Sequence, residues 1–191
     1  MKTYIYMVRH GQSPLTEGTE RTRGLTDKGI LDASRITALL QPEGIEVFVS
    51  SPYQRAILTI QELAHSADQE MIVYENLKEQ HFSSAEIRMP NNELLPLLRQ
   101  CYADRLFARS DGESNADCQR RAIAVLQELL TTHQGRKIAI GTHGAVMALM
   151  MGYYDPRYDL DFMLNTSKPD VYRMEFKGHQ LLSVERLWDV K

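Results

Sequence analysis

The stretch YIYMVRHGQS, residues 4–13, is an apolar run that ends in an arginine, a histidine and a glycine. Residues 3–8 are nearly all apolar, β-branched or aromatic, a pattern typical of a buried strand. Arg9 and His10 would then lie at the carboxyl end of that strand, followed by Gly11, where the backbone can approach a ligand closely. Such a strand end is either a chemical site or an ordinary polar terminus, and the rest of the sequence is needed to decide.

The composition is that of an ordinary globular protein. The chain has 191 residues, of which 43% are hydrophobic and 25% charged, which fits a single domain over residues 1–191. A formal net charge of -3 gives no overall basic field that would attract nucleic acid or an anionic membrane. No apolar run approaches the ~20 residues that span a bilayer, and no secretory signal is visible. We therefore expect a cytoplasmic protein with neither nucleic-acid nor membrane partners.

The two cysteines, Cys101 and Cys118, form no C-x-x-C pair and lie near no histidine at a metal-type spacing. Neither is followed by an arginine six residues later, as a C-x5-R phosphatase signature would require. We expect both to be free, buried thiols.

Strand and helix patterns alternate along the rest of the chain. The predicted strands after the first are residues 45–51, 71–74 and the start of 137–151, and the predicted helices are 25–40, 53–66, 92–107, 113–133 and the end of 137–151. Thr26 is a candidate N-cap, and Pro96 should break or kink its helix. Residues 171–187 form two alternating runs around Lys177 and Gly178, which is typical of a β-hairpin.

This alternation predicts an α/β fold with three layers, in which helices cover both faces of a mainly parallel sheet. The terminal hairpin would add at least one antiparallel strand. In open α/β sheets, ligands bind outside the carboxyl ends of the strands. The polar residues at those ends are Arg9 and His10, then Ser50 and Ser51 with Arg55, then residues 75–81, and then Thr142 and His143.

Two histidines and two arginines among these residues point to phosphate. His10 and His143 each end an apolar strand and each precede a glycine. Arg9 and Arg55 can form a fork for a phosphate dianion. The helices that follow Ser51 and His143 would direct their first backbone N–H groups at an anion. The sequence therefore predicts a small positive pocket on a mildly acidic protein.

Six segments in a fixed order carry a family resemblance: VRHGQS (8–13), GLTDKG (24–29), SSPYQRAILT (50–59), LKEQHF (77–82), DGES (111–114) and GTHGAV (141–146). This set resembles the histidine phosphatase superfamily, also called phosphoglycerate mutase-like. The resemblance implies that His10 is the nucleophile and forms a phosphohistidine. It implies that Arg9, Arg55 and His143 hold the phosphoryl oxygens, and that Glu79 protonates the leaving oxygen and later activates water. It implies neither a metal nor another cofactor.

The loop after the nucleophile departs from the family pattern. Thr16 stands where the family often has an asparagine, and we assign Ser13 and Thr16 to substrate binding on this resemblance. Arg21 and Arg23 are either extra phosphate contacts or part of a solvated loop, and we favour the solvated loop.

The surroundings of the acid depart as well. After Glu79 the family commonly continues with a glycine and a tryptophan-acid-glycine stretch, whereas this chain reads QHFSSAEIRMP. Glu75 and Glu86 are the alternative acids, and each is better explained as a surface charge. Ser114, in the DGES segment, is best explained as a helix cap.

These observations predict a metal-independent phosphatase that hydrolyses phosphomonoesters through a phosphohistidine. One alternative is mutase-type phosphoryl transfer, for which this chain lacks the extra segments of the longer family members. Another is a non-catalytic phosphate-binding module, although Arg9, His10, Arg55 and His143 are all present. The partner is expected to be a small phosphorylated substrate, with a phosphoprotein as the other option, and the sequence does not indicate an oligomeric state. Specificity should come from residues 14–24, 80–110 and 153–170.

Overall fold

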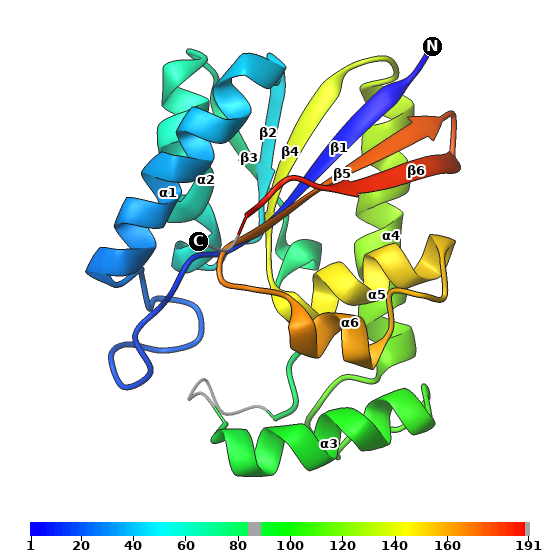
Figure 1. Ribbon diagram of the computed structural model, residues 1–191. Coiled ribbons are helices and arrows are strands. Elements are labelled where there is room, and N and C mark those ends of the chain that lie inside the picture. Colours follow the sequence, from blue (N-terminus) through cyan, green and yellow to red (C-terminus); the bar gives the residue numbers. More distant parts are fainter. Residues whose placement is uncertain (84–88, 190–191) are drawn as a thin grey trace.

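A six-stranded sheet forms the centre of the computed structural model, which describes residues 1–83 and 89–189 (Figure 1). The strands are β1 (Thr3–Arg9), β2 (Val47–Ser50), β3 (Met71–Val73), β4 (Lys137–Thr142), β5 (Asp170–Lys177) and β6 (Gln180–Arg186). The helices are α1 (Asp27–Leu40), α2 (Gln54–Ser66), α3 (Asn91–Ala103), α4 (Asn115–Thr132), α5 (Gly144–Tyr154) and α6 (Leu160–Asn165). Short 3-10 turns, η1 and η2, lie at Gln41–Glu43 and Glu75–Leu77.

The strands follow the order β3-β2-β4-β1-β5-β6. The pairs β3–β2, β2–β4 and β4–β1 are parallel, and β5 is antiparallel to both β1 and β6. The predicted mainly parallel sheet with an antiparallel strand from the terminal hairpin is confirmed. Because β1 and β4 are direct neighbours and Arg9 lies beside Thr142 in their register, the segments Arg9-His10-Gly11 and Thr142-His143-Gly144 lie side by side.

Helices cover both faces of the sheet, which confirms the three predicted layers. Alternate residues of a strand point to opposite faces. Ile5 and Met7 of β1 therefore pack with α4 and α5, whereas Tyr6 and Val8 pack with α1 and α2. Figure 1 shows α1 and α2 on one side of the sheet and α4 and α5 on the other.

Two local predictions about helices have different outcomes. The Thr26 hydroxyl accepts a hydrogen bond from the Gly29 N–H at 3.1 Å, as predicted for an N-cap. Helix α3, however, runs through Pro96 without a break, because a proline removes one N–H donor and the rest of the ladder persists. The kink, which was the other expected outcome, stays a prediction. The helix also ends at Ala103, before the predicted end. The Asp104 carboxylate there accepts from the Leu106 N–H at 3.0 Å, a local turn that competes with helix.

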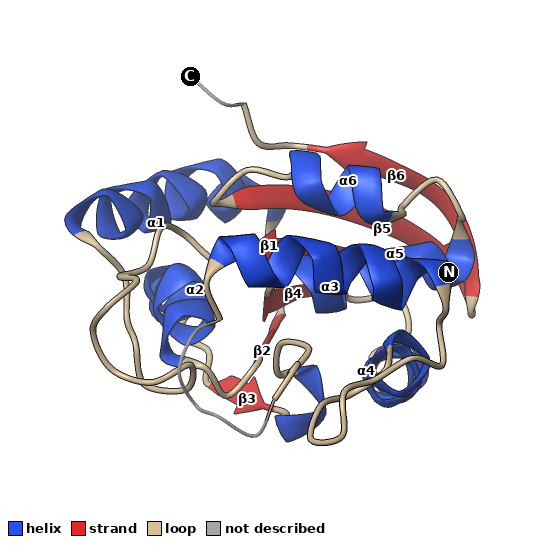
Figure 2. Cartoon of the chain, turned by 90° about the horizontal axis from the view of Figure 1, so that it is seen from below, coloured by secondary structure: helices blue, strands red, loops and turns tan. Residues whose placement is uncertain are grey.

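Helices α3 and α6 lie beyond the carboxyl ends of the parallel strands. Figure 2, seen from that end, shows α3 crossing in front of the sheet with α6 nearby. Cys101 and Cys118 are free and buried, as predicted. None of the helices within the described residues is both long and apolar enough to cross a membrane.

Candidate active site

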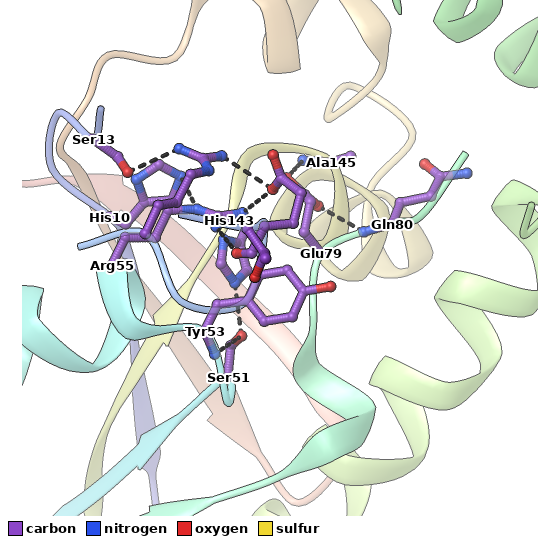
Figure 3. A network of polar contacts seen from close by, with 12 residues as sticks. His10, Ser13, Ser51, Tyr53, Arg55, Glu79, Gln80, His143 and Ala145 are labelled. Atoms are coloured by element: carbon purple, nitrogen blue, oxygen red, sulfur yellow. Dashed lines mark hydrogen bonds and ion pairs between the residues drawn. The ribbon is translucent and has the colours of Figure 1, made fainter. Parts of the chain in front are cut away.

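The ends of β1 and β4 bring two buried histidines together. The rings of His10 and His143 meet edge to face, with centroids 5.2 Å apart (Figure 3). His10 directly follows β1, and His143 is the N-cap residue of α5. Arg55, in the first turn of α2, reaches the same point with a side chain that is only 1% exposed.

The hydrogen bonds of His10 fix its tautomer. Its Nδ1 atom lies 2.7 Å from the Gly11 carbonyl oxygen, which can only accept, so Nδ1 carries the proton. The other nitrogen, Nε2, therefore presents a lone pair, and Arg55 Nε donates to it at 3.3 Å. Burial, and then the positive charge of Arg55, lower the pKa of His10 well below its usual value of 6.5. His10 is thus a neutral imidazole at neutral pH, with Nε2 as its basic atom.

His143 is held by one ring nitrogen, and its other ring nitrogen is unpaired. Its Nε2 atom lies 2.7 Å from the Ser51 hydroxyl, which also accepts from the Tyr53 N–H at 3.2 Å. Within the described part of the chain, the buried Nδ1 atom has no hydrogen-bond partner. When the Ser51 hydroxyl donates to Nε2, Nδ1 carries a proton that can be donated to an oxyanion. Burial, followed by the charge of Arg55, lowers the pKa of His143 well below 6.5.

The Arg9 guanidinium is packed against bare backbone. A Cβ atom on Gly144 would lie 2.8 Å from Arg9 Nη2, closer than real contacts allow, so any larger residue there would have to displace the guanidinium. Arg9 Nη1 donates to the Thr166 carbonyl at 2.8 Å, at the end of α6. The side chain is therefore fixed by β1, α5 and α6 together. Burial lowers the pKa of Arg9.

The Glu79 carboxylate lies at the N-terminus of α5. Its oxygens accept from the N–H groups of Gln80 at 3.0 Å, Ala145 at 3.2 Å and Val146 at 2.9 Å. Figure 3 shows this side chain pointing toward the two histidines. The first N–H groups of α5, which we expected to face a bound anion, thus already hold a carboxyl group of the protein.

Arg121 of α4 holds the segment that carries Glu79. This role of Arg121 was not predicted from the sequence. Its Nη1 atom donates to the carbonyls of Asn76 at 2.7 Å and Lys78 at 2.9 Å, and its Nε atom donates to the Glu113 carboxylate at 2.6 Å. The only signal in the sequence is a charged residue beside the apolar face of the predicted helix, which is common on helices.

Glu20 is the second residue of the site that was not predicted from the sequence. Its carboxylate oxygen Oε2 accepts from Arg55 Nη2 at 2.8 Å and from Arg23 Nη2 at 3.1 Å, and its carbonyl accepts from Arg55 Nη1. Burial, and then the charge of Arg23, lower the pKa of Arg55 to about 10. One loop carboxylate therefore occupies part of the guanidinium fork that was predicted to hold phosphate.

The loop arginines divide between the two interpretations. The Arg23 side chain is 9% exposed and lines the cavity described below, so the favoured solvated-loop interpretation is wrong for this residue. Arg21 also borders the cavity, but its side chain is 48% exposed and forms an ion pair with Glu75 at 2.7 Å. That contact lowers the pKa of Glu75, as expected of a paired surface carboxylate.

The other predicted residues lie as follows. The buried Ser13 hydroxyl donates to the Gly24 carbonyl at 2.6 Å and accepts from Arg23 at 2.8 Å, so its described contacts brace the loop. Thr16 is exposed and does not line the cavity. Glu86 lies outside the described residues. Ser114 caps α4 as predicted, accepting from the Asp117 N–H at 3.1 Å.

A cavity of about 910 Å³ opens at this end of the sheet, and Arg9, His10, Arg55 and Glu79 all line it. It is large for a phosphate group alone. Among residues 1–83 and 89–189, no group of three or more His, Cys, Asp or Glu side chains is arranged to hold a metal ion.

The fold and the site together define an α/β protein with a neutral imidazole at the sheet's carboxyl edge, in contact with the buried guanidinium of Arg55. A sequence model of the histidine phosphatase superfamily (branch 1) matches residues 5–188. The chain belongs to this superfamily. Among sequence relatives, a probable phosphoglycerate mutase of Yersinia pestis, GpmB, is 26% identical over 157 residues, covering 77% of this chain and 72% of the relative.

Solved structures share the fold at lower identity. YhfR of Bacillus stearothermophilus superposes with a TM-score of 0.80 at 24% identity, covering 99% of this chain and 98% of its own. A phosphoserine phosphatase mutant of Entamoeba histolytica, in complex with phosphoserine, gives a TM-score of 0.77 at 21% identity, covering 95% and 96%. A mycobacterial glucosyl-3-phosphoglycerate phosphatase gives 0.76 at 18% identity, covering 100% of both chains.

Proposed function

We propose that this protein is a metal-independent phosphatase that hydrolyses small phosphomonoesters through a phosphohistidine on His10. The observation that carries the proposal is the state of His10: Nδ1 is protonated toward the Gly11 carbonyl, and the Nε2 lone pair faces the Arg55 guanidinium. A nucleophilic imidazole must be neutral, and burial keeps this one neutral.

The reaction has two steps. His10 Nε2 attacks phosphorus, the bond to the ester oxygen breaks, and Glu79 in its protonated form gives a proton to the departing alkoxide. The Glu79 carboxylate then takes a proton from a water molecule that attacks the phosphohistidine. The N–P bond breaks, inorganic phosphate leaves, and His10 returns to its neutral form.

Charge on the transferring phosphoryl group is balanced by this chain's own cations. Arg55 is buried and Arg9 is partly buried, so their attraction for an oxyanion is screened less than it would be in water. His143 Nδ1 can supply one further hydrogen bond. Phosphoryl transfer depends mainly on such positioning and charge stabilisation.

Mutase-type transfer is the second candidate, because the GpmB relative of Yersinia pestis is named as a probable phosphoglycerate mutase. The solved neighbours named as phosphatases favour hydrolysis. Incubation with 3-phosphoglycerate separates the two reactions. A mutase produces 2-phosphoglycerate without net phosphate release, whereas a phosphatase forms no 2-phosphoglycerate.

The test is phosphate release from p-nitrophenyl phosphate with EDTA present, comparing wild type, His10→Ala and Glu79→Gln. We expect release by the wild type and none by His10→Ala. Glu79→Gln should slow alkyl phosphates far more than p-nitrophenyl phosphate, because only a poor leaving group needs the acid. Release that persists in His10→Ala would contradict the proposal, and equal slowing of both ester types would remove Glu79 from the acid role.

A further inference from the structure

The cavity has two chemically different walls. The phosphate end is formed by Arg9, His10 and Arg55. A second wall comes from residues 80–83 and from helices α3 and α6, and its apolar residues include Phe82, Leu94, Leu95, Leu98, Met163 and Leu164. A phosphate group with a short polar substituent would leave this wall facing water, which apolar surface disfavours.

Parts of the apolar wall are open to the cavity although their side chains are large and hydrophobic. Leu95 is 38% exposed and Leu164 is 43% exposed. Behind them, Leu98 and Met163 are buried against Ala145 and other α5 residues. The wall is thus built on the same helix that holds Glu79 and cradles Arg9, so its position relative to the phosphate end is fixed.

The charged side chains at the polar side of the cavity are paired with one another in several places. The Glu75 carboxylate accepts from Arg21 at 2.7 Å and from Lys78 at 3.5 Å, so these cations already have an anionic partner. Glu20 and Glu79 add two more carboxyl groups to the lining, and Arg23 and Lys168 add two more cations.

We propose that the substrate is a phosphomonoester of an alcohol that carries an uncharged, apolar group of about ring size, which packs on the wall formed by α3 and α6. This inference rests on the proposed function of the phosphate end. A cavity of about 910 Å³ is within the usual range for ligands of that size. Apolar burial then supplies binding energy remote from the phosphoryl group.

The first test compares esters with similar alkyl leaving groups: 2-phenylethyl phosphate, ethyl phosphate and 3-phosphoglycerate. We expect kcat/KM for 2-phenylethyl phosphate to exceed that for the other two by roughly tenfold or more. In the double variant Leu95→Asn/Leu164→Asn, kcat/KM for 2-phenylethyl phosphate should fall by on the order of tenfold, whereas kcat/KM for ethyl phosphate should change by less than about twofold. Leu31→Asn, at a 68% exposed leucine of α1 that does not line the cavity, is the matched control.

A binding measurement separates failure of this inference from failure of the proposed function. Calorimetry with 3-phenylpropylphosphonate and propylphosphonate, which cannot be hydrolysed, does not depend on turnover. Tighter binding of the phenyl compound, lost in the double variant, supports the inference even if no ester is hydrolysed. Equal binding of the two phosphonates, or equal loss of both in the double variant, would overturn it.

Discussion

Replacing Glu20 by glutamine should make the phosphate site bind phosphate more tightly. The Glu20 carboxylate contacts Arg55 Nη2 at 2.8 Å and Arg23 Nη2 at 3.1 Å, next to the nucleophile. A phosphate dianion has to displace this carboxylate to reach the same guanidinium. A neutral amide competes less strongly, because hydrogen bonds between two charged groups are the stronger kind.

The size of the effect follows from the burial of the pair. Arg55 is 1% exposed and Glu20 25% exposed, so the contact is only partly screened by water. A hydrogen bond to a charged group contributes about 1.5–3 kcal/mol. If the substitution weakens the contact that phosphate must displace by about 2 kcal/mol, the Kd for phosphate should fall roughly thirtyfold. The Glu20 main-chain carbonyl, which also accepts from Arg55, is unchanged by the substitution.

Calorimetric titration with inorganic phosphate measures this directly. Glu17→Gln is the matched control, since it removes the same charge from an exposed residue of the same loop. We expect Glu17→Gln to leave the Kd within about twofold of wild type, because exposed charges are screened. If Glu20→Gln bound phosphate no more tightly, or more weakly, the carboxylate would be orienting Arg55 instead of competing for it.

Two further predictions concern the buried groups of the site. Gly144→Ala places a Cβ 2.8 Å from Arg9 Nη2; the displaced guanidinium should lower kcat/KM by roughly a hundredfold. Thermal denaturation checks that the fold is kept, and Gly24→Ala, whose Cβ meets only Leu58 at 3.3 Å, should stay near wild type. Separately, His10 and His143 stay neutral in the folded state, whereas the unfolded chain takes up protons below pH 6.5. The free energy of unfolding in phosphate-free urea titrations should therefore fall below that pH by up to about 1.4 kcal/mol per pH unit for each histidine. His10→Asn should remove about half of this slope, and an unchanged slope would refute the assignment.

The fold could be predicted because its signals are local and repeated. Each buried strand is a short apolar run. Twice, such a strand is followed directly by a histidine and a glycine, and a helix comes later in the chain. The mainly parallel sheet that this alternation predicts is observed, and β1 pairs with β4 in it. The predicted end of α3 was wrong because the turn that replaces the helix at Asp104 depends on a single side-chain contact. Helical periodicity in the sequence does not indicate such contacts.

The site likewise combines features that follow from repeated local signals with features that depend on single side-chain contacts. His10, Arg55 and His143 meet because strand ends and first helical turns meet at one edge of a parallel sheet, which topology alone dictates. Glu20 and Arg121 act across 35 and 43 residues of sequence, through the path of a loop and the rotamer of a long side chain. No periodicity encodes those contacts, so the charge balance at the phosphate end could not be read from the sequence.

Helix α5 joins these parts of the site. Gly144 carries the Arg9 contact, the N–H groups of Ala145 and Val146 hold Glu79, and Ala145 also packs in the cluster that supports the apolar wall. A shift of this helix would therefore move the phosphate-binding arginine, the acid and the wall together. Leu95 and Leu164 lie outside that buried cluster while still lining the cavity. Substitutions there can change the accepted organic group while the chemistry at His10 is preserved, which makes these two positions the most informative sites at which to test substrate choice.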